Sequence, residues 1–286
     1  MLKRLTEIIS FIKKEDIANE PGMIADTKES TVESIPTNIK DVRAKIRREF
    51  DHCEDIVIRT LEVGQDNFIR ILAVYFDGMI DKDTLNAHVL RPLLIGARIV
   101  QLKKSADKRT IVNILERNLI DNGEVVELTD FNQCVQNILS GNTVLFIEGA
   151  HIALATCTKG FTTRAVDEPD TESSVRGSRE GFVESFRVNT SLLRKRIKSP
   201  AFKIEEITIG QQTNTKVGIA YVEGIVDRRI VEEVRRRLYS IKVDGVLESG
   251  VIEEMIRDSP LSPVPTVANS EKPDKVASKL LEGRVA

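Results

Sequence analysis

The chain has 286 residues, of which 41% are hydrophobic, and a formal net charge of −2. This composition is typical of a folded protein long enough for two domains, and it does not mark the whole chain as a nucleic-acid binder, although local charged patches stay open. The three cysteines, Cys53, Cys134 and Cys157, form no CxxC pair, so neither a disulfide framework nor a zinc knuckle is predicted. Unpaired cysteines favour a reducing compartment.

Residues 1–36 are predicted to form an N-terminal helix and a flexible linker. The helix, within residues 2–14, has apolar positions on one face at Leu2, Leu5, Ile9 and Ile12. Such a face suits a membrane surface, a partner helix or the chain's own fold. Basic residues interrupt it, so no signal peptide is predicted, and no apolar run approaches the roughly 18 residues that span a bilayer. We expect the chain, taken alone, to be soluble.

The first predicted lobe spans residues 37–165. It begins with a helix, capped by Thr37 or Asn38, that ends near Phe50. Two strands at 55–62 and 68–76 follow, joined by a turn in which Gly64 supplies a positive φ. The next segments are a helix capped by Asp81, a helix at 110–118, an edge strand at 124–128 and a helix from Thr129 or Asp130 to Leu139. Residues 143–147 and 151–156 then form an apolar hairpin, which is typical of central strands buried on both faces.

The second predicted lobe spans residues 166–286. A helix from about Arg179 to Ile197 is followed by strands at 202–209 and 215–223, with Gly210 in the turn. Three helices complete it: one from Asp227 to Tyr239, one at 247–257 and one near 273–282. We predict an α/β fold (α+β lobes) made of two related α/β subdomains with mixed sheets.

An internal repeat underlies this prediction. Four pairs of residues share one separation along the chain: Gly64 and Gly210, Tyr75 and Tyr221, Gly78 and Gly224, and Asp81 and Asp227. A repeat of this kind indicates two copies of one supersecondary unit. Two similar lobes usually leave a crevice between them, and Gly78 and Gly224 either line it or simply end their strands.

The two copies differ at their ends. Leu139 and Gly141 correspond to Leu281 and Gly283, but the apolar hairpin that follows Gly141 has no counterpart after Gly283. We therefore expect the sequence to be a fragment in which a neighbouring strand edge of the second lobe is left open.

Motifs for catalysis or cofactor binding are missing from the sequence. His52, His88 and His151 show no metal-ligand spacing, and no GxGxxG, GxxxxGK[ST] or GxSxG motif occurs. We expect neither an enzyme nor a bound cofactor or metal.

The most informative stretch runs from Asp167 to Arg196. Its acidic start leads to Ser178, which can cap a helix, with Arg176 and Arg179 beside the helix N-terminus. Free N–H groups and bidentate arginines there suit an anionic ligand. The alternative is that both arginines pair with the acidic segment or with the other lobe. The candidate ligand or interlobe residues are Arg176, Arg179, Glu180, Asn189, Arg194, Tyr75 and Tyr221.

Two basic runs, at 194–196 and 235–237, allow two interpretations. Such runs are usually solvated helix faces, and membrane headgroups or an acidic partner surface are the alternatives.

Three segments resemble one family: VRGSREGFVESFRVNTSLLRKRI, IGQQTNTKVGIAYVEGIVD and the ending EKPDKVASKLLEGRVA. They resemble the N-terminal hydrophilic domain of the A subunit of the spore germinant receptors of endospore-forming bacteria. The resemblance runs from about residue 37 to the last residue.

The resemblance implies a role and a setting. Members continue past this domain into a further apolar strand and membrane-spanning helices. They assemble with B and C subunits in the spore inner membrane and respond to amino acids, sugars or ions, and no catalysis is attached to the family. It also implies a two-lobed module similar in outline to substrate-binding proteins, on the cytoplasmic (core) side, with further A subunits and a small nutrient as additional partners.

The sequence and the family resemblance together suggest two functions. The first is signal coupling and complex assembly within a nutrient receptor, because two lobes can adopt different arrangements. The second is direct binding of a small germinant in the crevice between the lobes, with Arg176 or Arg179 holding an anionic group.

Overall fold

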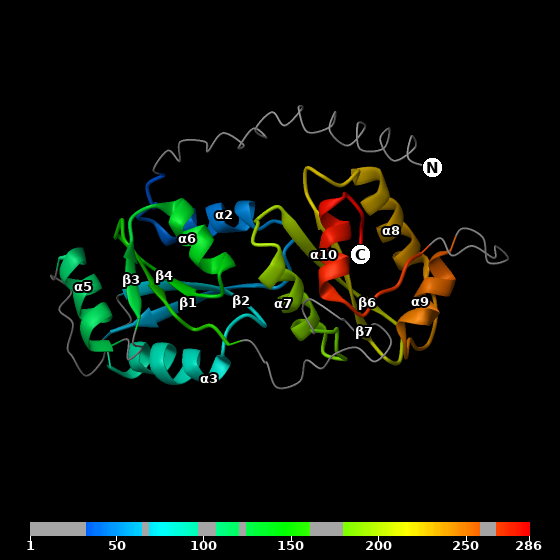
Figure 1. Cartoon of the computed structure of the whole chain (residues 1–286). Helices are drawn as coiled ribbons and strands as arrows, with labels where there is room; N and C mark the ends of the chain where they lie inside the picture. The colour runs from blue at the N-terminus through cyan, green and yellow to red at the C-terminus, as the bar shows by residue number, and fades with distance from the viewer. Residues whose placement is uncertain (1–32, 65–68, 97–106, 120–123, 161–179, 258–266) are drawn as a thin grey trace, which may run out of the picture. The chain divides into compact units, whose positions relative to one another are not determined.

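The computed structural model describes residues 33–64, 69–96, 107–119, 124–160, 180–257 and 267–286 (Figure 1). The predicted helix at 2–14, most of the linker, Arg176 and Arg179 lie outside the described residues. Helices and strands alternate along the described chain, which confirms the α/β class. We refer to residues 33–160 as the first half and to residues 180–286 as the second half.

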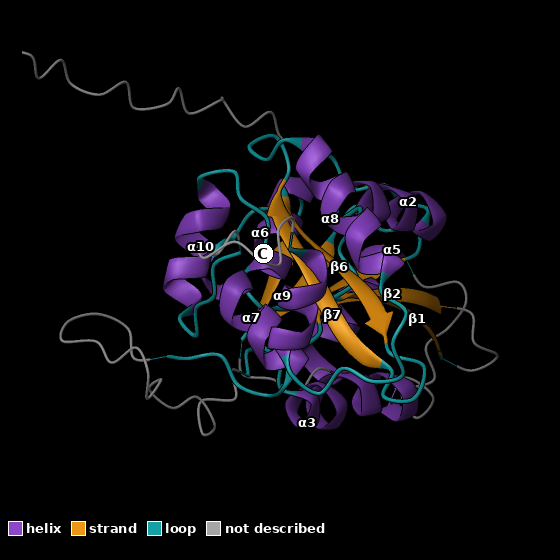
Figure 2. Ribbon diagram, turned by 90° about the vertical axis from the view of Figure 1, so that its right-hand side faces the viewer, coloured by secondary structure: helices purple, strands orange, loops and turns teal. Residues whose placement is uncertain are grey.

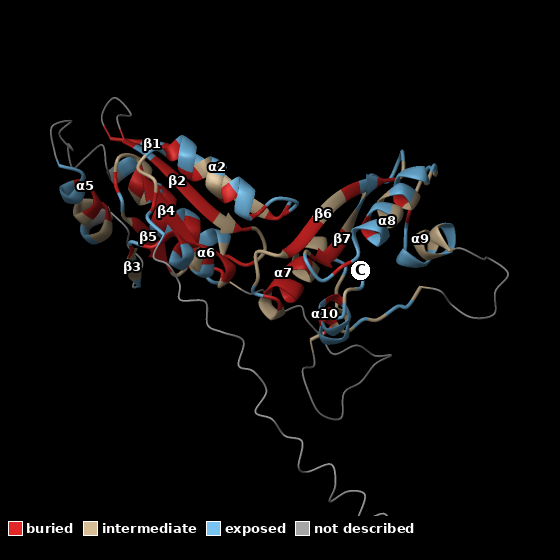
Figure 3. Cartoon of the chain, turned by 90° about the horizontal axis from the view of Figure 1, so that it is seen from above, coloured by how far each residue is buried: buried red, intermediate tan, exposed pale blue. Residues whose placement is uncertain are grey.

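The first half contains a five-stranded antiparallel sheet. Its order is β1-β2-β4-β5-β3, made of β1 (Ile56–Val63), β2 (Ile69–Phe76), β4 (Thr143–Ile147), β5 (Ala153–Thr156) and β3 (Val125–Leu128). As predicted, β3 is an edge strand. The apolar hairpin is central, and every residue of β4 and β5 is buried (Figure 3). A run without polar alternation therefore marks strands that are covered on both faces.

Helices cover both faces of this sheet. One face packs against α2 (Ile39–Glu49) and α6 (Phe131–Leu139). The other packs against η2 (Leu85–Leu90), η3 (Pro92–Gly96), α5 (Lys108–Ile114) and η4 (Leu115–Leu119), and the short α3 (Lys82–Thr84) leads into η2. The predicted caps are present: the side chains of Asn38, Asp81 and Asp130 each accept a hydrogen bond from the backbone N–H two residues on.

The second half builds the same layers around a smaller sheet. Strands β6 (Phe202–Ile209) and β7 (Thr215–Val222) pair antiparallel. Helices α7 (Phe186–Arg196) and α10 (Pro273–Leu281) cover one face, and α8 (Arg228–Ser240) and α9 (Ser249–Ile256) cover the other (Figure 2). All pairings between named strands are antiparallel, and the parallel contribution among the described residues is a single bridge between Cys53 and Ile204.

The element bounds reproduce the repeat. At the separation that relates Gly64 to Gly210, the first and last residues of β1 and β2 become those of β6 and β7. Asp227 caps α8 as Asp81 caps α3, and Gly64 and Gly210 both have a φ of 90°. Helices α6 and α10 match at the shorter separation that relates Leu139 to Leu281. Equivalent residues therefore form equivalent local structure.

The start of α7 differs from the prediction. The sequence predicts a helix from about Arg179, capped by Ser178, whereas α7 begins at Phe186 with Ser185 in the cap position. The backbone N–H and C=O of Val183 are both hydrogen-bonded to the side chain of Asn189, at 2.8 and 2.6 Å. The side chain of Asn189 thus competes with helical bonding at Val183. Residues 180–185 are not helical, so the predicted helix start at about Arg179 is wrong.

The glycines that end β2 and β7 have different surroundings. Gly78 and Gly224 both have a positive φ, of 88° and 83°. A Cβ on Gly78 would lie 2.7 Å from the backbone oxygen of Arg187 in α7, whereas a Cβ on Gly224 would meet no atom within 4 Å. Gly78 thus permits a close approach of the first half to the second, and Gly224 satisfies the local turn alone.

This difference predicts unequal effects of the same substitution. Gly78→Ala and Gly224→Ala both force alanine into a left-handed conformation, which costs about 1–2 kcal/mol. We expect Gly78→Ala to lower the free energy of unfolding by a further ~1–3 kcal/mol, because α7 has to move. Urea unfolding of both variants measures the difference, and equal losses would show that the approach to α7 is unimportant.

Candidate functional site

The two halves meet where residues 51–55, between α2 and β1, lie against β6 and α7. We call this region the junction. The N–H of Ile204 donates to the carbonyl of His52 at 3.1 Å, and the N–H of Glu54 donates to the carbonyl of Ile204 at 3.0 Å. This pattern is that of a short parallel strand pair. A segment of the first half therefore extends the sheet of the second half at the edge of β6.

A buried ion pair lies at the centre of the junction. The guanidinium of Arg194 in α7 donates to both carboxylate oxygens of Asp55, at 2.8 and 2.9 Å, and a third N–H donates to the carbonyl of Phe202 at 2.7 Å. Both charged side chains are 1% exposed. The guanidinium carbon also lies 4.3 and 4.9 Å from the ring centroids of Phe76 and Phe202, within cation–π distance.

Electrostatics keep this pair charged. Burial alone would lower the pKa of Arg194, but the adjacent carboxylate of Asp55 outweighs it, so the pKa of Arg194 is raised. Burial also raises the pKa of the Cys53 thiol, although Arg194 opposes that shift. Cys53 is thus a neutral thiol, 3.6 Å from the carbonyl of Phe202, rather than a reactive thiolate.

A second arginine of α7 bridges the two halves beside Gly78. Arg187 lies 3.6 Å from the carboxylate of Asp77, which follows β2, and 2.8 Å from the carboxylate of Glu206 on β6. Asp77 in turn donates its backbone N–H to the carbonyl of Asp55 at 2.8 Å. The two ion pairs of α7 are therefore linked through the backbone of the first half.

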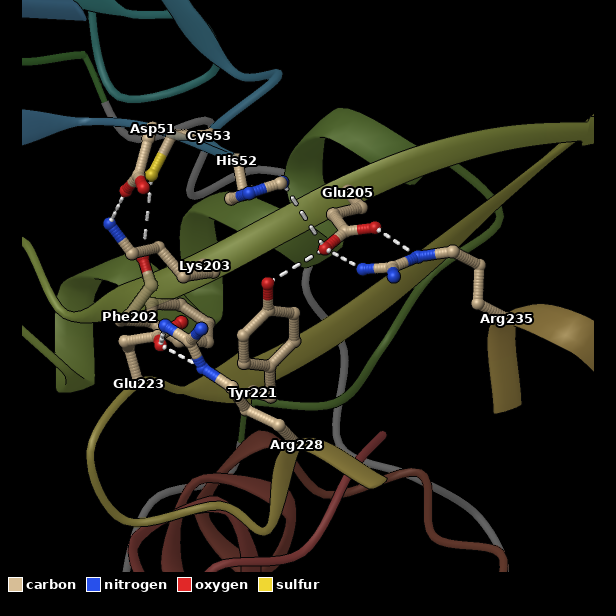
Figure 4. A network of polar contacts seen from close by, with 10 residues as sticks. All are labelled: Asp51, His52, Cys53, Phe202, Lys203, Glu205, Tyr221, Glu223, Arg228 and Arg235. Atoms are coloured by element: carbon tan, nitrogen blue, oxygen red, sulfur yellow. Dashed lines mark hydrogen bonds and ion pairs between the residues drawn. The ribbon is translucent and has the colours of Figure 1, made fainter. Parts of the chain in front are cut away.

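The other face of β6 carries a polar network centred on Glu205 (Figure 4). Its carboxylate accepts hydrogen bonds from the hydroxyl of Tyr221 at 2.7 Å and from Arg235 of α8 at 2.7 and 3.0 Å, and it lies 3.5 Å from Nδ1 of His52. Partial burial would raise the pKa of Glu205, but the hydrogen bonds from Arg235 and Tyr221 outweigh it and hold the pKa below its ordinary value. Burial and the hydrogen bond to Glu205 raise the pKa of Tyr221.

Two further ion pairs lie near Glu205, and one of them joins the two halves. Lys203 on β6 pairs with Asp51 of the first half, whose side chain is 55% exposed. Arg228 at the start of α8 donates to Glu223 at 2.8 Å (Figure 4). An exposed pair such as Arg228 with Glu223 contributes little to stability, whereas Lys203 is itself buried and Asp51 is its charged partner. Among the described ion pairs of the junction, Asp55–Arg194 is the one in which both side chains are buried.

The predicted site residues that the structure describes lie at several separate places. Arg194 lies on the α7 face of β6, while Tyr221 lies on the opposite, α8 face. Tyr75 packs against the core of the five-stranded sheet. Glu180 pairs with Lys195 and Arg196, at 2.7 and 2.8 Å, and Asn189 binds the backbone of Val183.

The two basic runs differ in exposure, and their side chains bind carboxylates of the chain; Arg236 is 68% exposed, as expected of a solvated helix face. Arg194 is buried, and its neighbours Lys195 and Arg196 both bind Glu180. In the second run, Arg235 binds Glu205, and the two arginines that follow it bind Glu233. Carboxylates of the chain itself therefore neutralise both runs.

Several junction residues escape prediction from sequence: Asp51, Asp55, Asp77, Arg187, Lys203 and Glu205. Asp55 and Arg194 are 139 positions apart, and no local pattern links them. A usable signal exists only for Glu205, because a lone carboxylate at an inward position of an alternating strand requires a partner.

The described residues contain no group of three histidine, cysteine or acidic side chains that could hold a metal ion. A cavity of about 540 Å³ lies beside α8, lined by Asp227, Arg229, Ile230, Glu233, Val234, Arg237, Ile256 and Val267. Its charged side chains are paired with one another, Arg229 with Asp227 and Arg237 with Glu233. None of the helices in the described ranges is long and apolar enough to cross a membrane.

Comparison with known proteins gives consistent matches. The chain is 34% identical over 259 residues to spore germination protein KA of Bacillus subtilis (strain 168), covering 91% of this chain and 46% of that protein. It is 36% identical over 264 residues to the uncharacterized membrane protein YfkQ of the same organism, covering 92% and 50%. The chain thus spans about half the length of the curated relatives it matches.

A solved structure matches in fold. The N-terminal domain of the A subunit of the Bacillus megaterium spore germinant receptor GerK3 superposes with a TM-score of 0.65 at 29% identity, covering 89% of this chain and 92% of that chain. The family model of the Bacillus/Clostridium GerA spore germination proteins matches residues 44–286. The chain belongs to the GerA spore germination protein family.

Proposed function

We propose that this chain is the N-terminal part of an A-type subunit of a spore germinant receptor and that it acts in spore germination. The observation that carries this proposal is the match to the N-terminal domain of the GerK3 A subunit, which covers nearly all of both chains. The family match over residues 44–286 supports the same role. Catalysis has no part in the proposal.

Within that role we propose that the domain takes part in signal coupling and in assembly of the receptor complex, and that it does not catalyse a reaction. The contacts that join the halves include a shared strand edge, the buried Asp55–Arg194 pair and the bridge through Arg187. Breaking a buried ion pair by removing one partner costs about 3–5 kcal/mol. A junction held in this way can pass a displacement of one half to the other, as a signal-coupling domain requires.

We propose the following setting for the intact protein. Its partners are the B and C subunits of the receptor and further A subunits, and its location is the spore inner membrane, with this domain on the cytoplasmic (core) side. The remainder of the protein supplies the membrane attachment. The length of the relatives, about twice that of this chain, and the similarity to the membrane protein YfkQ support this arrangement.

A spore experiment tests the coupling role. Replacing the chromosomal copy with an Asp55→Asn variant leaves Arg194 buried and unpaired, so we expect a loss of about 3–5 kcal/mol of stability and of the response to nutrients. Glu282→Gln is the control, because it makes the same carboxylate-to-amide change at a pair whose side chains are 54% and 48% exposed, and it should cost less than about 1 kcal/mol. Nutrient-triggered loss of refractility and an immunoblot of the protein are measured together.

A double variant separates coupling from unfolding. Asp55→Leu with Arg194→Met removes both charges, and such replacements are often neutral for stability. We expect normal protein levels but an impaired response to amino acids and sugars, because the buried bidentate contact that orients α7 against residues 51–55 is then lost. A normal response of this variant would contradict the coupling role, and a normal response of spores that lack the whole gene would contradict the role in germination.

Direct binding of a small germinant is the second candidate function. The cavity beside α8 supports it, since about 540 Å³ accommodates an amino acid or a sugar. The crevice between the lobes, with Arg176 or Arg179 holding an anionic group, is the other proposed location.

Thermal unfolding of the chain with amino acids, sugars and inorganic ions tests direct binding. A ligand at 100 times its Kd should stabilise the fold by about 2.7 kcal/mol. If an anionic nutrient binds through the proposed arginines, Arg176→Ala or Arg179→Ala abolishes the shift and Arg236→Ala, at an exposed ion pair, preserves it. The absence of a shift with every nutrient that triggers germination would eliminate direct binding and leave the coupling role standing.

A further inference from the structure

Arg187 of α7 lies between two carboxylates, one on each half of the chain. Its Nη2 donates to Oε2 of Glu206 on β6 at 2.8 Å, and its Nε lies 3.6 Å from Oδ2 of Asp77, which follows β2. The first distance is that of a charge-assisted hydrogen bond, whereas the second is longer than a hydrogen bond. Arg187 is therefore bonded within the second half and attracted at longer range to the first.

Each of the two carboxylates also has a lysine of its own. Lys82 at the start of α3 lies 2.9 Å from Oδ1 of Asp77, and Lys216 on β7 binds Oε1 of Glu206. One oxygen of each carboxylate thus binds its lysine, and the other faces Arg187. The five side chains form a row of alternating charge across the junction, with Arg187 at its centre and a competing cation at either end.

The guanidinium of Arg187 is incompletely bonded. Its Nη1 is buried and has no hydrogen-bond partner among the residues that the structure describes. A buried donor without a partner costs free energy, so an arrangement that satisfies more donors can compete with this one. Rotation of the side chain toward Asp77 provides such an arrangement, because Oδ2 of Asp77 is within reach of a small movement.

The helix does not have to move for this exchange of partners. Arg194, about two turns further along α7, fixes the helix against Asp55, and the N–H of Asp77 donates to the carbonyl of Asp55 at 2.8 Å. These contacts keep Arg187 close to Asp77 whichever carboxylate it binds. A change of partner by the side chain alone therefore alters how strongly the second half is bound to the first.

We propose that Arg187 is a two-position switch in the junction, which binds Glu206 in one state and Asp77 in the other, with Lys82 and Lys216 setting the balance. Bonding to Asp77 tightens the contact between the halves, and bonding to Glu206 loosens it. This inference rests on the proposed coupling role and supplies that role with an element that has two discrete arrangements.

Two matched lysine variants test the switch. Lys82→Met leaves Asp77 without its own cation, so Asp77 attracts Arg187 more strongly. Lys216→Met does the same for Glu206. The side chains of the two lysines are 69% and 55% exposed, so both substitutions should leave the hydrophobic cores unchanged.

Hydrogen exchange measured by NMR reports on the junction. The amides of Glu54 and Ile204 donate across it at 3.0 and 3.1 Å, and the amide of Ile219, within the β6–β7 pair, is the reference for global unfolding. We expect Lys82→Met to slow the exchange of both junction amides by about twofold to fivefold, the range expected for exposed ion pairs, and Lys216→Met to accelerate it by a similar factor. The exchange of the reference amide should not change.

The same two substitutions in an Arg187→Met background are the control. Without the guanidinium, the opposite effects of the two lysine variants should disappear. Effects of the same sign, no effect, or opposite effects that persist without Arg187 would overturn the proposal. The response to nutrients does not enter this measurement, so a negative result removes the switch and leaves the coupling role standing.

Discussion

The contact of Arg194 with Asp55 is the interaction on which the arrangement of the second half against the first depends. Both side chains are almost completely buried, and the guanidinium satisfies two carboxylate oxygens and a backbone carbonyl between two phenylalanine rings. Desolvating two charges offsets much of their attraction, so the pair adds little net stability. Its effect is directional, because only one position of α7 against residues 51–55 satisfies every donor and acceptor.

The two halves that this pair joins are copies of one supersecondary unit, and the two copies have different neighbours. The strand pair, the capping aspartates and the positive-φ glycines recur at matching positions. What differs is the neighbour of each copy. Gly78 contacts the backbone of α7, whereas Gly224 faces open space. The edge of β2 that faces away from β1 is covered by β4, whereas the edge of β7 that faces away from β6 pairs, among the residues the structure describes, with Ala286. In the first copy, β2 thus has a strand on each side, whereas in the second copy one edge of β7 lacks a neighbouring strand within the described residues.

Local structure can largely be predicted from the sequence, and the site cannot. Strand and cap positions follow from alternation, turn glycines and capping residues, all of which act within a few positions of the chain. The sequence misplaces the start of α7 because Ser178 and Ser185 are equally good caps, and the choice is made by Asn189 folding back onto Val183.

Long-range contacts have no such local signal. The partner of Asp55 is 139 positions away, so nothing near Asp55 in the sequence indicates its role. Arg194 stands out in the sequence for its basic neighbours, yet it is the member of that run that is buried and bound across the junction.

The most direct test of the central claim is a distance distribution between the halves. Spin labels at two exposed positions, Gln136 in α6 and Tyr239 in α8, report on the halves separately in a Cys157→Ser background. Double electron–electron resonance should give one narrow distribution, which broadens in Asp55→Asn and stays narrow in Glu282→Gln, a change at an exposed ion pair away from the junction. A broad or two-component distribution in the parent chain, or an unchanged one in Asp55→Asn, would contradict the claim that this ion pair fixes the two halves together.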